Sequence, residues 1–260
     1  LKRRTKAQIA REAGLEPLID AILGNPALDP EAEAAKFVNA DKGVADAKAA
    51  LDGARAIFIE RIGENAELVG SLRQWKWDNG IVTSKVAKGK DAAGAKFSDY
   101  FDFSQKIKDL PSHRALALLR GRNEEFLELD LDVATEDGKP HPAEGKIRVA
   151  FGLQDRGRPA DKWIGDGIRL AWKARLAVSL SVDLMTRLKE IADKEAISVF
   201  SKNIKDLMLA APAGARATMG VDPGIRTGCK IAVVDQTGKV LDTATVYPHE
   251  PRNDWNGALA

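Results

Sequence analysis

The feature that most constrains the fold is a row of large apolar residues that recur every four positions between residues 161 and 210. The row consists of Ile164, Ile168, Trp172, Leu176, Leu180, Leu184 and Leu188. This spacing predicts helix, because residues four apart lie on one face. An α-helix has 3.6 residues per turn, so the row drifts around its surface. We therefore expect either one helix that passes across several neighbours or two helices with a break.

Composition places the chain among ordinary globular proteins. Its 260 residues are 44% hydrophobic and 30% charged, which is enough for a sizeable core. Lys and Arg number 40 against 38 Asp and Glu, so the net charge of +2 excludes a uniformly basic coat but allows local basic patches. The single cysteine, Cys229, excludes a disulfide framework and is expected to be buried. No apolar run reaches the roughly 18 residues of a membrane span, and we expect a cytoplasmic protein without membrane contact.

The remaining patterns predict a mainly α (α+β) fold, in which a helical scaffold carries a small β insertion. Thr5 and Asp29 are typical caps for short helices near the start of the chain. Alternating apolar residues at Leu127–Val133 and again at Ile147–Phe151 predict a β pair at about 124–152. We assign residues 1–214 to this scaffold.

Residues 215–260 differ in character from the scaffold and predict a second domain. Three short strands separated by turns are expected at about 217–221, 230–234 and 240–247. The chain begins at Leu1 without a methionine and ends at Ala260 where no element is being closed. We therefore expect a piece of a longer protein whose second domain is incomplete.

Two stretches of the scaffold are candidates for contact with nucleic acid. The first is the basic start of the chain, with Lys2, Arg3, Arg4 and Lys6. The second interleaves tryptophans with basic residues, which is how single strands are held: Arg73, Trp75, Lys76, Trp77, Lys85, Lys88 and Lys90. The alternative interpretation is that the first run is solvated surface and that one tryptophan lies in the core with the other at its rim.

Asp222 is the candidate catalytic residue, because an acid at the tip of a strand can hold a divalent metal ion over a sheet. Arg226 and Lys230 flank the following turn and are further candidates for phosphate contact. The alternative for Asp222 is a structural role in which its side chain caps the turn at Gly224. The segment Arg122–Asp137 carries seven acids and one Arg, so it should repel nucleic acid and is a candidate docking surface for a basic protein.

Six separated strings resemble the Tex family of bacterial transcription accessory proteins, and the resemblance covers essentially the whole chain. They are Arg3–Ala10, Lys96–Phe101, Pro111–Ala115, Leu119–Glu124, Ala210–Gly214 and Val221–Gly228, the last of which is similar to the opening of the YqgF-type, RNase H-like α/β domain. The resemblance implies a helical scaffold followed by a truncated RNase H-like domain. It also implies that the helix-hairpin-helix and OB-fold parts of the family are missing here.

The resemblance implies a nucleic-acid-binding scaffold that acts with the transcription machinery. We expect sequence-independent binding of single-stranded RNA or DNA, no cofactor, no bound metal and no enzymatic activity. Two alternatives stay open. One is a metal-dependent nuclease or resolvase with Asp222 as a ligand, and the other is a scaffold for protein–protein docking.

Overall fold

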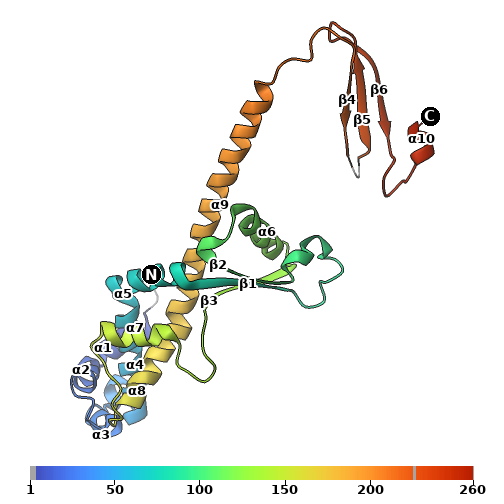
Figure 1. Ribbon diagram of the computed structural model, residues 1–260. Coiled ribbons are helices and arrows are strands. Elements are labelled where there is room, and N and C mark those ends of the chain that lie inside the picture. Colours follow the sequence, from blue (N-terminus) through green and yellow to red (C-terminus); the bar gives the residue numbers. More distant parts are fainter. Residues whose placement is uncertain (1–3, 225–226, 260) are drawn as a thin grey trace. The chain divides into compact units, whose positions relative to one another are not determined.

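The computed structural model describes residues 4–224 and 227–259, and the chain divides into two compact units, Leu1–Ser198 and Val199–Ala260 (Figure 1). The first unit contains one sheet and helices α1–α8 with most of α9, and the second contains the end of α9, the other sheet and α10. The helices are α1 Lys6–Glu12, α2 Glu16–Gly24, α3 Pro30–Ala35, α4 Ala47–Glu64, α5 Ala66–Asn79, α6 Ser112–Asn123, α7 Pro142–Ala150, α8 Asp161–Ala171, α9 Ala177–Met208 and α10 Trp255–Leu259. The mainly α (α+β) prediction is confirmed.

A first hydrophobic core gathers α1–α5 with α7 and α8 around α4. Helix α4 buries alanines beside larger residues such as Phe58, and these small side chains let neighbouring helices approach closely. The predicted caps are confirmed. Thr5 Oγ1 accepts a hydrogen bond from Gln8 N at 3.1 Å, and Asp29 Oδ1 accepts one from Glu31 N at 2.9 Å.

A second core lies between a three-stranded antiparallel sheet and the helices α6 and α9. The strands are β1 Gly80–Val86, β2 Asp102–Lys106 and β3 Leu127–Val133, in the order β2-β1-β3. Val82 is fully buried on the central strand, and its register partners are Gln105 and Leu131.

The predicted β pair at about 124–152 is wrong in its second half. The strand at Leu127–Val133 is present, but its partner is β1, and residues 142–150 form helix α7. Apolar residues recur here every four positions as well as every two, at Ala143, Ile147 and Phe151. The helical face is the one that packs: Ile147 is fully buried, whereas Val149 is 81% exposed. Pro142 at the first helical position and His141 as N-cap favour the helix.

The long apolar row passes from one core to the other on a single run of helix. Residues 164–180 of the row belong to the first core, and Leu184 and Leu188 belong to the second. Between α8 and α9 the helix opens into one π-helical stretch, Trp172–Leu176. A π turn takes up an additional residue, which suits a row spaced at four rather than 3.6. Of the two expectations, the helix that passes across several neighbours is confirmed.

The second unit holds the predicted strands as β4 Thr218–Asp222, β5 Cys229–Val234 and β6 Val240–Val246, antiparallel in that order. Cys229 is buried, as expected. In the turn between β5 and β6, Asp235 Oδ1 accepts hydrogen bonds from Thr237 N at 2.7 Å and Lys239 N at 3.0 Å. In the part of the chain that is described, no helix combines the length and apolarity needed to cross a bilayer.

Candidate nucleic-acid interface

The structure describes only part of the basic start of the chain. Lys2 and Arg3 lie outside the described residues. Arg4 and Lys6 are exposed, but Arg4 forms an ion pair with Glu12 at 3.0 Å. Thr5, between them, donates a hydrogen bond to the buried Glu60 at 3.0 Å, which fixes this end of α1 against α4. Part of the predicted patch is thus paired with acidic side chains, since Arg4 contacts Glu12 and the adjacent Thr5 contacts Glu60.

The prediction that Lys76 contacts nucleic acid is wrong, because its side chain is 1% exposed. Its Nζ donates to Ser181 Oγ at 2.9 Å and lies 3.8 Å from Oδ1 of Asp132. Burial lowers the pKa of this lysine, an effect that the charge of Asp132 partly opposes. A residue on the inner face of α5 cannot reach a ligand in solvent.

The flanking tryptophans serve the packing of α5. Trp75 packs against the first core and Trp77 against the second, so both are partly buried and neither matches the expected division into core and rim. The guanidinium carbon of Arg187 lies 4.0 Å from the centroid of Trp77. Arg73 is about half exposed and pairs with Asp183 at 3.0 Å.

Three lysines of the predicted patch are exposed on β1 and just after it, but acidic residues lie among them. Lys85 stands opposite Asp102 on one neighbouring strand and Glu128 on the other. Lys88 lies in the following turn, and Lys90 Nζ lies 6.0 Å from the ring of Phe126. The structure therefore separates the stretch 73–90 into buried, paired and exposed residues rather than one basic face.

Asp222 ends β4 and is exposed, with Lys230 as its register partner on β5. Both residues line a hollow of about 640 Å³ on one face of this sheet. Arg226 lies outside the described residues. Among residues 4–224 and 227–259, no group of three or more His, Cys, Asp or Glu side chains is arranged to hold a metal ion.

A further basic region, missed by sequence reasoning, lies on α7, the following loop, α8 and the π-helical stretch after it. Residues 146–175 carry eight Lys and Arg but only three acids, a signal that was readable from the sequence. The strand assignment at 147–151 hid it, because it did not place Lys146 and Arg148 on a helix that precedes the cations of the loop and of α8. Those cations are Lys146, Arg148, Arg156, Arg158, Lys162, Arg169, Lys173 and Arg175.

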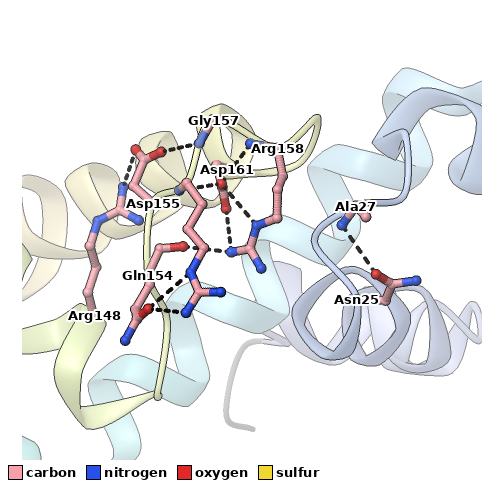
Figure 2. Close-up of polar contacts among 9 residues, drawn as sticks. Asn25, Ala27, Arg148, Gln154, Asp155, Gly157, Arg158 and Asp161 are labelled. Atoms are coloured by element: carbon pink, nitrogen blue, oxygen red, sulfur yellow. Dashed lines mark hydrogen bonds and ion pairs between the residues drawn. The ribbon is translucent and has the colours of Figure 1, made fainter.

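The buried carboxylate of Asp161 organises the loop (Figure 2). Its Oδ2 accepts hydrogen bonds from the backbone N–H of Arg156 at 2.8 Å and of Arg158 at 2.9 Å, and the Arg158 guanidinium donates to both oxygens. The Arg158 side chain, with help from the backbone N–H groups, holds the pKa of Asp161 well below its usual range against the opposing effect of burial. The loop is thus fixed in shape before any ligand arrives.

A hollow of about 650 Å³ lies between α7, this loop and α8. Its lining includes Arg148, Lys162 and Arg169. The Arg148 guanidinium lies 3.6 Å from Asp155 (Figure 2). It also lies against α8 at Gly165, where a Cβ atom would come within 2.7 Å of Nη2. Arg169 lies 3.5 Å from Asp166. The Arg169 side chain is 52% exposed, so some of its guanidinium N–H groups are available to a phosphate, whereas the Arg148 side chain is only 22% exposed.

A second hollow, of about 560 Å³, adjoins the first and shares Pro140, Glu144 and Arg169 with it. We call the two hollows together the α7–α8 groove. One wall holds His141, whose Nδ1 accepts from Ala143 N at 3.2 Å, so Nε2 carries the proton and donates to Asp132 at 3.1 Å. The His141 ring stacks on Trp172 with 4.7 Å between centroids. This wall is rigid, and Lys173 adds a further exposed cation at its rim.

Fold and groove define the chain as a mainly helical scaffold with a preformed cleft whose walls carry both cationic and acidic side chains. Residues 25–200 match the Tex central region-like family, and residues 216–260 match the Tex protein YqgF-like domain. The chain therefore belongs to the Tex family, as its sequence motifs predict.

Curated relatives agree with this assignment. Protein tex of Bordetella pertussis is 51% identical over 99% of this chain and 34% of its own length. The transcriptional accessory protein Tex of Neisseria gonorrhoeae is 48% identical over 97% of this chain and 33% of its own length. Human S1 RNA-binding domain-containing protein 1 is 28% identical over 94% of this chain and 25% of its own length. The chain thus spans about a third of the length of its bacterial relatives.

Proposed function

We propose that this chain is a scaffold segment of a transcription accessory protein, and that its α7–α8 groove holds the backbone of single-stranded RNA or DNA. The observation that carries the proposal is the convergence of Arg148, Lys162 and Arg169 on one preformed hollow. The same hollow is also lined by the acids Glu144, Asp155, Asp161 and Asp166. Guanidinium and ammonium groups on one face supply the phosphate contacts that dominate such binding. The relatives named as transcription accessory and RNA-binding proteins support this role.

The groove favours one strand over a duplex for reasons of size. Its hollows are those of a ligand pocket, a few hundred Å³ each, whereas a duplex needs a broad surface. The affinity should arise mainly from phosphates and fall steeply with salt. Contact with the transcription machinery is part of the proposal and would use other surfaces, among them the acidic strand β3.

The same proposal gives Asp222 no catalytic role. Lys230 stands directly opposite Asp222 on β5, so an ammonium group competes with any metal ion for this carboxylate. Incubating labelled RNA with the protein and Mg²⁺ tests this point. Cleavage that disappears in Asp222→Asn would overturn it and favour the nuclease alternative.

The test of the groove is a titration of labelled oligouridine of about ten nucleotides at about 50 and 200 mM salt. Two double variants each remove two positive charges: Lys162→Ala with Arg169→Ala in the groove, and Lys202→Ala with Lys205→Ala on α9 as the matched control. The groove variant should bind more weakly and lower the slope of log K against log salt by about 1.4, at about 0.7 per lost phosphate contact.

The control variant should bind like the unchanged protein. Equal binding by the groove variant and the control would overturn the proposal. A loss confined to Lys88→Ala with Lys90→Ala would instead place the contacts at the patch predicted from the sequence.

A further inference from the structure

Strand β3 lies at an edge of its sheet, because the strand order is β2-β1-β3. In antiparallel pairing, the backbone N–H and C=O groups of successive residues point alternately to one side of the strand and to the other. Val86 N donates to Phe101 O at 3.2 Å, so Val86 and every second residue before it face β2. The residues between them face β3, where Thr83 pairs with Asp130. The backbone groups of Leu129, next to Asp130, therefore point away from the sheet.

Contacts near the two ends of β3 show how much of this edge is open. The Ser181 hydroxyl on α9 lies 3.1 Å from the outward-pointing carbonyl oxygen of Leu131. At the other end, Phe126 N donates to Gly121 O on α6 at 2.9 Å. Between these contacts, the N–H and C=O of Leu129 have no hydrogen-bond partner outside the sheet in the part of the chain that is described. Such unpaired edge groups are a template for an additional strand.

A hollow of about 300 Å³ lies along the open stretch, between β3 and the helices α6 and α9. Residues 129–131 line it on one side, and Leu119, Val182 and Met185 line it on the other. Val182 is 60% exposed although it is apolar. Because side chains alternate along a strand, a strand added at this edge would place every second side chain over these apolar residues.

The charges around the hollow differ between its two walls. On β3 the exposed acids Glu128 and Asp130 point to the face of the sheet opposite the helices, since they alternate with the core-facing leucines. The helical wall carries Arg122 and Lys189, and Lys189 forms an ion pair with Asp193. Opposite charges directly across a strand pair are favourable. An added strand should therefore carry lysine or arginine on its outward face and apolar residues on its inward face.

We propose that β3 accepts a short extended segment of a partner protein, in which apolar residues alternate with lysine or arginine, as a fourth strand of the sheet. The segment pairs with the backbone of Leu129, covers Val182 and Met185, and places a cation beside Asp130. The inference rests on the part of the proposed function that assigns a protein contact to β3. It does not involve the α7–α8 groove, so the oligouridine titration and the peptide experiments below can fail independently.

The first experiment measures the binding of a labelled hexapeptide of alternating valine and lysine by fluorescence anisotropy, at about 150 mM salt to screen distant charges. Asp130→Lys should weaken binding about tenfold, because it sets like charges opposite each other. Asp137→Lys makes the same change of charge in the loop after β3 and should leave binding nearly unchanged. Equal losses in the two variants would mean that only the overall charge matters and would overturn the inference.

The second experiment tests the hollow. Val182→Lys places a long, charged side chain over it, and Val178→Lys is the control, one helical turn earlier and 63% exposed. Both positions are exposed, so both variants should fold. Only Val182→Lys should lower the affinity for the peptide, and equal affinities would overturn the inference. Analytical ultracentrifugation checks the protein without peptide: a dimer that Val182→Lys abolishes would also overturn it, by assigning the edge to a second copy of the chain.

The third experiment separates strand addition from attraction between charges. In an extended peptide the backbone N–H groups of the valines point to one edge and those of the lysines to the other. Methylating the backbone nitrogens of either set keeps every side chain and charge. Only one of the two methylated peptides should lose binding: the valine set for an antiparallel strand, and the lysine set for a parallel one. Equal binding of the two peptides, whether retained or lost, would overturn the inference.

Discussion

The Nζ atom of Lys76 lies 3.8 Å from Oδ1 of Asp132, although the lysine is 1% exposed and the aspartate side chain is 44% exposed. The same ammonium group donates to Ser181 on α9 and lies 5.4 Å from the ring centroid of Trp172. One cation thus joins α5, β3 and the long helix. Its long hydrocarbon stem fills core volume while the charged end reaches the partners at the boundary.

Replacing Lys76 should therefore affect stability rather than binding. Lys76→Ala leaves a cavity and an Asp132 without its cation, and should lower the free energy of unfolding by about 3 kcal/mol. Lys76→Met fills the same volume without the charge and should lower it by less than about half of that amount. Urea denaturation measures both. An equal loss in the two variants would mean that the charge, not the volume, carries the effect.

The pH dependence of this residue has a defined sign. Burial lowers the pKa of Lys76 in the folded protein below its value of about 10.4 in the unfolded chain. Between the two values the unfolded state binds the additional proton, so stability rises with pH. In the alkaline range up to about pH 10.4 the unchanged protein should gain stability relative to Lys76→Met. A difference in the free energy of unfolding between the two proteins that does not change with pH would contradict the prediction.

The pH dependence of Asp161 has the same sign but lies in the acidic range. Its pKa is lowered in the folded protein, first by the Arg158 side chain, so its contribution is complete above the unfolded value of about 3.9 and is lost as pH falls. Asp161→Asn should lower the free energy of unfolding by about 2 to 3 kcal/mol near neutral pH. This difference should shrink below about pH 4. Asp166→Asn, at an aspartate five residues later whose side chain is 43% exposed, is the control and should change little.

Gly121 and Gly70 are both helical glycines and should respond in opposite directions. A Cβ atom at Gly121 would overlap the side chain of Leu127 and press on Phe97, so Gly121→Ala should cost about 1 to 3 kcal/mol. Gly70 has nothing within 4 Å of the same position, and Gly70→Ala should stabilise the protein by about 0.5 to 1 kcal/mol. Thermal unfolding of both variants measures the contrast. A change in stability of the same sign in the two variants would contradict the prediction.

The sequence was informative where a pattern depends on neighbours along the chain. The caps at Thr5 and Asp29, the strand at Leu127–Val133 and the three strands of the second unit follow local rules. At residues 147–151 two periods fit the same short segment, and the helix is selected by packing against α5 and α8 together with Pro142 and the His141 cap at its start. Lys76 continues the four-residue spacing of the buried Leu68 and Leu72 on α5, but its charge favours solvent, and its partners Ser181 and Asp132 come from distant parts of the chain.

The candidate interface was harder to predict for a related reason. A basic patch depends on which charges are left after ion pairing, and those pairs join distant parts of the chain. Arg73 pairs with Asp183, and Lys85 stands between strands that carry acids. The groove, by contrast, draws its cations from one stretch, but its shape requires the loop fold around Asp161.

The π-helical stretch Trp172–Leu176 predicts an asymmetry between two single-residue deletions. Removing the exposed Ala174 should convert the π turn to an α turn, keep the flanking helices in register, and cost little stability. Removing the exposed Val178, in regular helix, should rotate the following residues by about 100° and turn Leu184 and Leu188 out of the second core. Circular dichroism melting compares the two. An equal decrease in melting temperature for the two deletions would contradict the prediction.

A helix that is part of two cores has a consequence for how the first unit comes apart. The row of Leu176, Leu180 and Leu184 crosses from one core to the next without an intervening loop. If either core unfolds, the shared helix loses about half of its buried contacts. The two cores should therefore unfold in one cooperative transition rather than one after the other. The backbone amides around Leu180 should accordingly be the slowest in the unit to exchange with deuterium.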